Sequence, residues 1–504
     1  MKNTRKLLAV VLSVIMALSA LPFAAFAKDV SYTQDCPNIY IHGFAACTIW
    51  EDPSDPNSKS VFPPETDVIL DNVKKAVPAF ALYAVNKDGK MLADALTPIC
   101  LDLLGPAFLN ENGEVPEGNT TGVRFTYPPA SCISKTSNLN FDYDWRLDPI
   151  VIAAQLNDYI EYVCAASGCD QVTIMAHSFG GIVTLAYANI YGTSRLKGVV
   201  MNSTAIYGET YNGELMTGDL YLSMDAVESF MQYAMSETDY DTIIDGAFAI
   251  FEKAGLKDFL EKAANQIIAD AGEDIMANVI LPMFIQWPSV WAMTPDEYME
   301  DANEFVFNGN LIDKEKDYSA LKSKINAYDT IVRAGKTEKL IEMESEMNFG
   351  VFARYGFSTI PLTSSWDNMS DGIVDTKYSS FGATTAKHGE TLSADYLAGV
   401  DAKYISPDKS IDASTCLFPE KTWFVKNYIH THSTLLPELV MAILYADEEV
   451  TVDTYEAYPR FMIYDNDEFA PQEKDDTLNP FQKLAKFIKQ IIALLKTAFE
   501  KLFK

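Results

Sequence analysis

Apolar residues occur along the chain in short uninterrupted runs that are separated by longer amphipathic stretches. Runs of about four to eight apolar residues are typical of strands buried on both faces of a parallel sheet. Apolar positions spaced by three and four residues indicate helices instead. The runs that predict strands are 38–44, 122–127, 172–175, 196–201, 349–355 and 421–426. Strands that alternate with helices predict an α/β fold built on a mostly parallel sheet.

Three helices are expected to pack on this sheet. The helix through 152–163 has a clear start, because Asp148 can cap it and Pro149 fits its first position, where no hydrogen-bonded N–H is needed. Two further helices are indicated at 182–190 and 439–445. Each follows a predicted strand closely, which is the connection that parallel strands require.

Two long segments interrupt this order. The segment 207–346 has a helical pattern throughout, with acidic amphipathic stretches at 226–235, 243–251 and 260–271. Because it lies between two predicted strands, we expect a large cap over the carboxyl edge of the sheet, where caps control substrate access. An independent all-helical domain is the alternative. The segment 46–121 has four prolines in its first part and is expected to form an irregular surface excursion beside the site.

Ser178 lies where a predicted strand runs straight into a predicted helix. Ala176 and Gly180, two positions to either side, are small enough for a sharp turn at this point. A strand, a serine between small residues and a helix are typical of the nucleophile elbow of the α/β-hydrolase fold. The Phe179 N–H is expected to point into the space beside the Ser178 oxygen, where an oxyanion would be stabilised. The alternative is a serine that merely begins a helix.

A second oxyanion donor is expected from the first strand. The run 38–44 ends in His42-Gly43-Phe44. Glycine allows a backbone to approach a substrate closely, and in serine hydrolases a loop at this place donates the second N–H. The Phe44 N–H is the candidate, and His42 is expected to be a structural loop residue.

The base is expected to be a histidine that follows the serine, as in the order Ser, Asp or Glu, His. The chain has five histidines, and three of them follow Ser178. His430 and His432 both lie between the last predicted strand and the last predicted helix, and both fit, with a slight preference for His430. His388 lies in a polar stretch and is expected at the surface.

The carboxylate that orients the base is expected at Asp371. It follows the predicted strand 349–355 in the string Ser370-Asp-Gly-Ile-Val374. Gly372 permits the turn that would direct Asp371 towards the histidine. Asp367 and Asp375 are the alternatives, although either is more typical of a solvated loop charge.

Composition restricts the partners and cofactors. The 504 residues carry a formal net charge of −31, which excludes nucleic-acid binding by phosphate neutralisation. Seven cysteines leave at least one unpaired within the chain, and their spacings match no zinc-binding pattern, so we expect them to be structural. A serine, a histidine and an aspartate need no cofactor, and none is expected, nor is a metal.

The two ends of the chain differ from its middle. Residues 1–27 contain three cationic side chains, then an apolar run and then an Ala-Phe-Ala sequence. This order predicts a cleaved secretory signal, and a retained membrane anchor is the alternative. Residues 481–504 predict a basic amphipathic helix with six lysines on one side. A membrane or envelope surface is its expected partner, and docking on the acidic body or self-association are the alternatives. The expected organisation is therefore signal 1–27, core 28–206, helical cap 207–346, core 347–464, acidic linker 465–480 and terminal helix 481–504.

Two motifs resemble one family of α/β-hydrolases. The string Tyr143-Asp-Trp-Arg146-Leu-Asp-Pro149, followed about thirty residues later by His177-Ser178-Phe-Gly-Gly181, is similar to the lecithin–cholesterol acyltransferase family, which includes lysosomal phospholipase A2-type enzymes. The Pro- and Trp-rich stretch 288–295 is also similar to that family. The resemblance implies an acyl-enzyme formed from lipid esters, with water or an alcohol as acceptor. A carboxylesterase or peptidase on the same fold, and a non-catalytic surface-binding protein, remain the rival interpretations.

Overall fold

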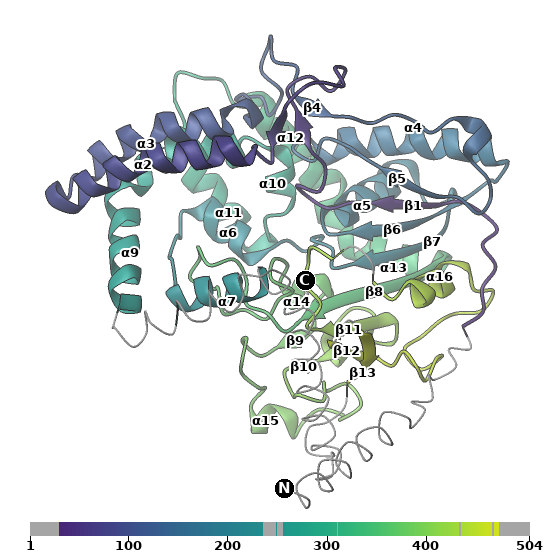
Figure 1. The fold of residues 1–504 in the computed structure, drawn as a ribbon. Coiled ribbons are helices and arrows are strands. Elements are labelled where there is room, and N and C mark those ends of the chain that lie inside the picture. The colour runs from purple at the N-terminus through teal and green to yellow at the C-terminus, as the bar shows by residue number, and fades with distance from the viewer. Residues whose placement is uncertain are drawn as a thin grey trace, which may run out of the picture.

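A computed structural model describes residues 30–234, 248, 256–309, 311–432, 435–465 and 468–472. At its centre is an eight-stranded sheet in the order β13-β12-β11-β8-β7-β6-β1-β5 (Figure 1). Neighbouring strands are parallel except for the β12–β13 pair. The strands are β1 (Asn38–Ile41), β5 (Asn138–Phe141), β6 (Val172–His177), β7 (Leu196–Asn202), β8 (Asn348–Tyr355), β11 (Thr422–Lys426), β12 (Phe461–Asp465) and β13 (Glu468–Pro471).

The buried central strands agree with the sequence pattern, and the edge strands do not. The predicted runs at 172–175, 196–201, 349–355 and 421–426 are confirmed as β6, β7, β8 and β11. The edge strand β5 was not predicted, because two of its four residues are exposed asparagines and only Phe141 is fully buried. Strands at an edge need no continuous apolar run, so hydrophobicity alone does not reveal them.

One predicted strand belongs elsewhere. The run 122–127 forms only β4 (Gly122–Val123), which pairs with β2 (Ile49–Trp50) in a separate three-stranded sheet completed by β3 (Ser60–Phe62). The prediction of a core strand there is wrong. The apolar side chains of this run instead pack as an aromatic cluster, with Phe125 against Phe141 and Tyr159.

Helices cover both faces of the large sheet. Side chains of successive strand residues point to opposite faces, so Val199 packs in the core formed with α4 (Pro149–Ser167) and α5 (Phe179–Tyr191). Val200 packs instead with α16 (Pro437–Tyr445) on the other face. The expected capping holds at α4, where the Asp148 side chain accepts a hydrogen bond from the Ile150 N–H. This arrangement gives the α/β fold that the pattern predicted.

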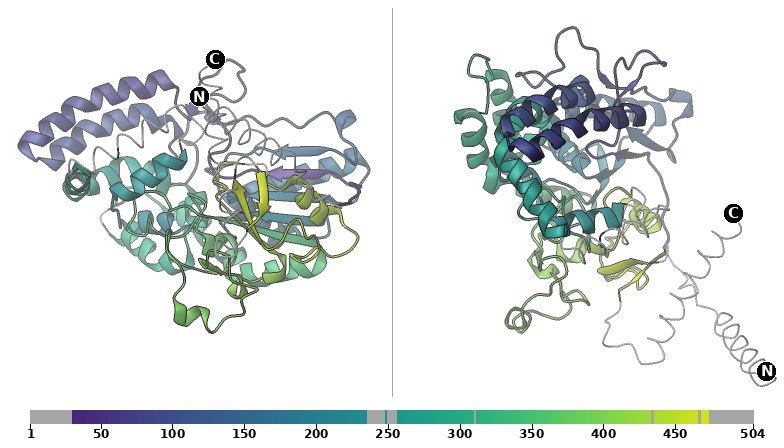
Figure 2. Two further views of the ribbon diagram at one scale, coloured as in Figure 1. Left: turned by 60° about the horizontal axis from the view of Figure 1, so that its bottom comes forward. Right: turned by 60° about the vertical axis from the view of Figure 1, so that its left-hand side comes forward.

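The first long segment is helical, which contradicts the irregular excursion expected at 46–121. It forms α2 (Thr66–Asn86) and α3 (Gly89–Leu104), which pack on each other and project from the body of the molecule (Figure 2). Pro78 and Pro98 lie inside these helices, although proline is unfavourable in a helix interior. No helix among the described residues is long and apolar enough to cross a membrane.

The second long segment is helical, as predicted. Among its described residues it forms α6 (Thr210–Thr217), α7 (Met224–Ala234), α9 (Leu256–Ile275), η3 (Met276–Ile285), α10 (Pro288–Ala292), α11 (Met299–Asn303), α12 (Ser319–Ile331) and α13 (Lys336–Glu346). Leu321 of α12 and Leu340 of α13 belong to the same buried cluster as Val183 of α5. These helices therefore share a core with the sheet. Most of the expected stretch 243–251 lies outside the described residues.

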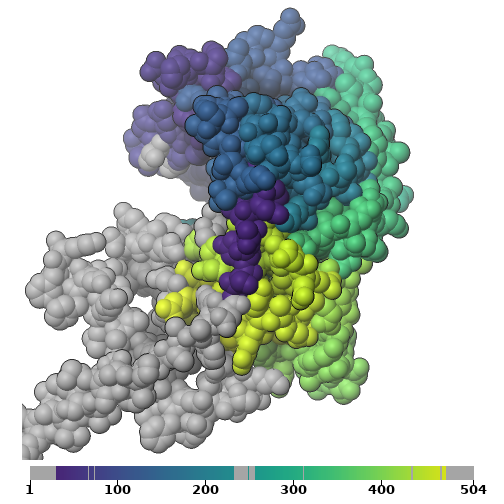
Figure 3. All heavy atoms as spheres, turned by 90° about the vertical axis from the view of Figure 1, so that its right-hand side faces the viewer, coloured from purple at the N-terminus to yellow at the C-terminus, as the bar shows by residue number. Residues whose placement is uncertain are grey.

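The two halves of the chain also meet away from the insertions. The segment that begins at residue 30 runs between the early and the late parts of the chain on the face shown in Figure 3. Cys36 belongs to the same buried cluster as Leu439, and the Tyr445 hydroxyl donates a hydrogen bond of 2.8 Å to the Cys36 carbonyl. The expected signal 1–27 and the terminal helix 481–504 lie outside the described residues. Of the expected acidic linker 465–480, residues 466–467 and 473–480 also lie outside them. The described part of this segment is not a linker, because it forms β13, which pairs with β12 in the large sheet.

Candidate active site

Ser178 occupies the turn between β6 and α5 in a strained backbone conformation. Its φ is 56° and its ψ is −124°, values that a residue with a side chain rarely adopts. The Ser178 N–H donates a hydrogen bond of 3.1 Å to the Asn202 carbonyl, and this bond anchors the turn to β7. A Cβ added at Gly180 would lie 2.3 Å from the Ile41 carbonyl oxygen. The small residue expected two positions after the serine is therefore required by the packing of the turn on β1.

The loop after β1 lies directly against the serine. A Cβ added at Gly43 would come within 2.6 Å of Ser178 Cβ and 3.0 Å of Ser178 Oγ, so only glycine lets this backbone pass. Phe44 follows, and its ring packs at 4.5 Å from that of Trp145. Phe179 is the first residue of α5, where N–H groups have no acceptor within the helix. The loop that carries Phe44 thus passes beside Ser178 at Gly43, and Phe179 follows Ser178 directly in the chain.

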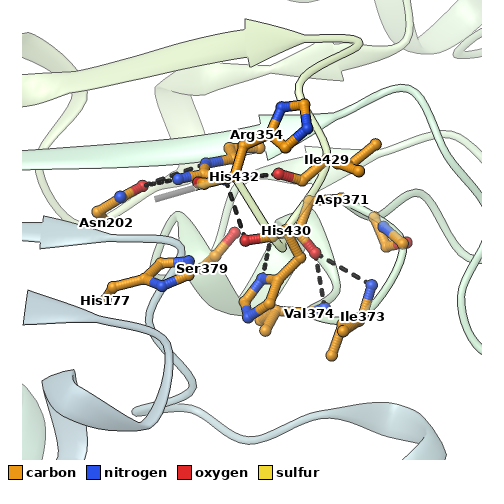
Figure 4. A network of polar contacts seen from close by, with 12 residues as sticks. His177, Asn202, Arg354, Asp371, Ile373, Val374, Ser379, Ile429, His430 and His432 are labelled. Atoms are coloured by element: carbon orange, nitrogen blue, oxygen red, sulfur yellow. Dashed lines mark hydrogen bonds and ion pairs between the residues drawn. The ribbon is translucent and has the colours of Figure 1, made fainter. Parts of the chain in front are cut away.

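His430 and Asp371 form a buried pair. His430 Nδ1 lies 2.7 Å from Asp371 Oδ2, and the His430 N–H donates 2.9 Å to the Asp371 carbonyl (Figure 4). The other carboxylate oxygen accepts hydrogen bonds from the N–H groups of Ile373 (3.1 Å) and Val374 (2.8 Å). These bonds hold the carboxylate in the loop after β8. They also fix the imidazole so that Nδ1 faces Asp371 and Nε2 does not.

Asp371 remains ionised in spite of its burial. Burial by itself raises the pKa of this carboxyl, but the neighbouring His430, the Arg354 guanidinium and the Val374 N–H together hold the pKa below its ordinary value. A buried carboxylate that stays charged stabilises positive charge on the imidazole beside it.

The structure distinguishes the two candidate histidines. The His432 ring packs on Tyr428, with ring centroids 5.0 Å apart, and the His432 carbonyl accepts a hydrogen bond from Arg354. His388 donates its backbone N–H to the Asp367 carbonyl (2.7 Å). Among the histidines that follow the serine, His430 is therefore the one that the fold brings to Asp371.

The two alternative acids have other partners. Asp367 forms an ion pair with Lys387 (2.6 Å). Asp375 is buried and accepts hydrogen bonds from the Thr210 N–H and hydroxyl at 2.8 and 2.9 Å and from Asn368 at 2.8 Å. Asp375 therefore ties the start of α6 to the loop after β8, which is a structural task.

Arg354 is an important residue that the sequence pattern did not single out. It lies fully buried in β8 and donates from Nη1 to the carbonyls of Ile429 (2.6 Å) and His432 (2.8 Å). Its Nε and Nη2 donate to the Asn202 side chain at 3.2 and 3.0 Å. One guanidinium thus connects the histidine loop to the strand that anchors Ser178 (Figure 4). A charged residue inside the apolar run 349–355 was the signal that could have revealed it.

His177 lies beside the pair without joining it. Its ring packs against that of His430, with centroids 4.7 Å apart and planes at 31°. Burial, and then the nearby His430 and Arg354, lower the pKa of His177 well below its ordinary value, so its ring is neutral. Because His177 immediately precedes Ser178, this contact places the His430 imidazole next to the serine turn.

Glu209 is a second buried acid near the site. It is 1% exposed, and its Oε2 has no hydrogen-bond partner among the described residues. Burial raises the pKa of Glu209 to about 8; the Tyr211 hydroxyl opposes this, and the Asp371 and Asp375 carboxylates add to it. Glu209 therefore carries a proton at neutral pH and adds no negative charge beside Asp371.

Comparison with known proteins supports the architecture. Residues 121–225, which include Ser178, match the family model described as the alpha/beta hydrolase fold. No curated protein matches the chain. Among solved structures, the Tle4–Tli4 complex is 15% identical, with a TM-score of 0.20, and the match covers 36% of this chain and 48% of that one. The chain thus spans about half the length of that relative.

A second solved structure is the bromoperoxidase from Bacillus anthracis, at 11% identity and a TM-score of 0.15, with 62% of this chain and 94% of that one covered. Neither likeness is close enough to carry an argument about activity. The family match, together with the parallel sheet and the turn at Ser178, shows that the protein has the α/β-hydrolase fold, which is typical of hydrolytic enzymes.

Proposed function

We propose that the protein is a serine hydrolase that acts on lipid acyl esters through an acyl-enzyme. The observation that carries this proposal is the arrangement at the carboxyl edge of the sheet. Ser178 occupies a strained strand-to-helix turn, and the His430–Asp371 pair lies at the ends of neighbouring strands, against the residue that precedes the serine. A nucleophile, an orienting carboxylate and a base in this chain order are the requirements of acyl transfer.

In this mechanism Ser178 Oγ attacks the ester carbonyl carbon while His430 Nε2 accepts the hydroxyl proton. The carbonyl oxygen becomes an oxyanion, which the N–H groups of Phe44 and Phe179 stabilise. Asp371 stabilises the imidazolium without taking its proton. The imidazolium then protonates the leaving alcohol and the acyl-enzyme forms. Water or a second alcohol, deprotonated by His430, attacks the acyl-enzyme and restores the serine.

The lipid part of the proposal rests on the sequence resemblance and on two structural features. Ser178 is only 3% exposed, so a substrate reaches it after covering side chains move, as expected for an enzyme that opens at an interface. The projecting helix α2 exposes several large apolar side chains, including Val77 (61%) and Val85 (83%). Contiguous exposed apolar residues are typical of a surface that contacts lipid or another apolar partner. The signal-like residues 1–27 support an exported enzyme.

The test is a comparison of the wild type with Ser178→Ala and with Ser289→Ala, a buried serine whose hydroxyl donates to the Arg146 carbonyl. Purified proteins are incubated with a fluorophosphonate probe and with p-nitrophenyl esters of increasing chain length. We expect Ser178→Ala to lose labelling and hydrolysis and Ser289→Ala to keep both, because only the elbow serine reacts. Labelling of Ser178→Ala at the wild-type level would refute the nucleophile.

Chain length tests the substrate class separately. A lipid-directed enzyme should favour medium or long acyl chains and should hydrolyse micellar phospholipid or acylglycerol. A steep preference for acetate, without activity on micellar lipid, would instead assign a carboxylesterase on the same fold. If the probe does not label the wild type at all, the interpretation as a non-catalytic surface-binding protein would be favoured instead.

A further inference from the structure

Three side chains that bind metals in other proteins meet at the ends of two neighbouring strands. Ile41 of β1 and Phe141 of β5 are paired in register. The next residues, His42 and Asp142, therefore leave the two parallel strands side by side at the carboxyl edge of the sheet. Cys47 returns to the same place at the far end of the loop that follows β1.

The ligand atoms of these three residues are close together. Cys47 Sγ lies 3.1 Å from His42 Nε2, and one atom of each of His42, Cys47 and Asp142 lies within 4.8 Å of the other two. In tetrahedral coordination at about 2.0 Å from nitrogen and oxygen and about 2.3 Å from sulfur, ligand atoms are separated by roughly 3 to 4 Å. Only small side-chain shifts are needed to place one ion between the three atoms.

The surroundings orient the histidine for this task. His42 Nδ1 lies 2.7 Å from the Gly43 carbonyl, to which it donates, so the lone pair is on Nε2, the atom that faces Cys47. Metal-binding histidines are commonly held in this way by a carbonyl on the other ring nitrogen. The His42 ring also stacks on Tyr143 at 4.2 Å and 7°. The Tyr143 N–H lies 3.4 Å from His42 Nε2, and because this contact is long it competes only weakly with a metal ion for the Nε2 lone pair.

We propose that His42 Nε2, Cys47 Sγ and an Asp142 carboxylate oxygen bind one zinc-class divalent ion. A thiolate and an imidazole favour zinc over magnesium or calcium, which prefer oxygen ligands alone. On binding, the Cys47 thiol releases its proton to solvent and the sulfur–metal bond replaces the S–H bond. The thiolate and carboxylate then supply two negative charges to balance the ion. His42 is buried while Cys47 and Asp142 are partly exposed, so the ion has a route from solvent.

The proposed ion would secure the loop that lies against the serine. Trp145 Nε1 already donates 2.8 Å to the Cys47 carbonyl, and the Tyr143 hydroxyl donates 2.5 Å to the His42 carbonyl. A bond from one ion to both ends of the segment 42–47 and to β5 would hold Gly43 and Phe44 in place. This effect on catalysis rests on the proposed function, whereas metal binding itself does not.

The test uses the full chain, reduced and freed of metal. Zinc affinity is measured by competition with a chromogenic chelator, and Co²⁺ serves as a spectroscopic probe. We expect one equivalent of Co²⁺ per chain, with the d–d bands of tetrahedral coordination and a sulfur-to-cobalt charge-transfer band. Cys47→Ser should abolish the charge-transfer band and weaken zinc binding by roughly 100-fold or more, and Asp142→Asn by roughly tenfold or more.

Cys132→Ser is the matched control, because Cys132 is exposed and unpaired in a different part of the chain; it should bind zinc and cobalt as the wild type does. Ser178→Ala should also bind both metals normally, which separates this proposal from the proposed esterase activity. No stoichiometric cobalt or zinc in the wild type would overturn the proposal, whether or not Cys47→Ser folds. A charge-transfer band that persists in Cys47→Ser would overturn it as well.

Discussion

The backbone of Ser178 stores strain that its neighbours must offset. A positive φ at a residue with a side chain costs on the order of 1–3 kcal/mol and persists only where the surroundings determine the geometry. Here the turn is held by the bond from the Ser178 N–H to Asn202 and by the close approach of Gly43 and Gly180 to their neighbours. The strained turn lies between the loop after β1, which approaches Ser178 Oγ at Gly43, and His177, whose ring packs against that of His430.

His430→Ala should lower kcat by roughly three orders of magnitude or more, because His430 Nδ1 is hydrogen-bonded to the Asp371 carboxylate, as the base of a triad requires. His432→Ala is the matched control and should change kcat by less than about tenfold, since its ring packs on Tyr428. Steady-state hydrolysis of a soluble ester measures both variants. An equal loss in the two would mean that His432 serves as base in the active conformation.

Glu209 makes stability depend on pH in a defined direction. Its ordinary pKa of 4.5 rises to about 8 in the folded chain, mainly because of burial. Between these values the folded chain keeps a proton that the unfolded chain releases, so stability falls as pH rises through this interval. Glu209→Gln removes the titration and keeps the shape.

We therefore expect the Tm of Glu209→Gln to exceed that of the wild type near pH 8 and to differ little near pH 4.5. Thermal unfolding across this range, followed by circular dichroism, measures the difference. A difference in Tm that does not change with pH would contradict the assignment of a buried neutral acid.

At the scale of elements, the site depends on how β7, β8 and the loop after β11 are joined. Arg354 makes this connection with the fixed fork of its guanidinium, which bonds the carbonyls around His430 and the Asn202 side chain at once. A lysine carries the same charge but cannot reach several carbonyls in one plane. Arg354 also helps to lower the pKa of Asp371, so one side chain both holds the loop that carries His430 and keeps Asp371 ionised.

Arg354→Lys should lower kcat by roughly 10- to 100-fold and leave KM nearly unchanged, because the base would be misplaced while the binding surface is kept. Arg460→Lys is the matched control, since Arg460 is also buried and donates to the carbonyls of Pro419 and Lys403, away from the site. Measuring kcat with equal fractions of folded enzyme separates an effect on the position of His430 from an effect on stability. Equal effects of the two substitutions on kcat would assign Arg354 a purely structural role.

At the scale of the whole molecule, charge is unevenly distributed. The net charge of −31 already includes the six lysines of residues 481–504, so the preceding body is more acidic than the total. An anionic membrane repels such a body. Two parts of the chain are candidates for membrane contact: the basic amphipathic sequence at its end and the exposed apolar side chains of α2.

A chain truncated after Pro480 should lose binding to anionic vesicles and keep its activity on soluble esters. Each lysine near an anionic surface contributes about 1 kcal/mol, and added salt should weaken binding of the full chain. Co-sedimentation with vesicles across a salt series measures this, with neutral vesicles as control. Equal binding by both chains would assign the contact to α2, which Val85→Glu would then test.

The sequence pattern alone was sufficient to predict the features that depend on neighbouring residues in the chain. Continuous apolar runs predict the buried strands β6, β7, β8 and β11, because both faces of these strands are covered. The small residues around Ser178 and the Asp148–Pro149 helix start are likewise consequences of short-range sterics and hydrogen bonding. The α/β-hydrolase fold could therefore be predicted from the sequence.

Other features depend on residues far apart in the chain that only folding brings together. The helices α2 and α3 formed in spite of their prolines, because packing on each other and on α9 outweighs local preference. His430 and His432 have equivalent sequence contexts, and only the path of the loop, held by Arg354, decides which one reaches Asp371. His42, Cys47 and Asp142 match no metal-binding spacing, since the pairing of β1 with β5 is what aligns them. Sequence periodicity reports burial along one element, whereas contacts between elements are set by the three-dimensional path of the chain.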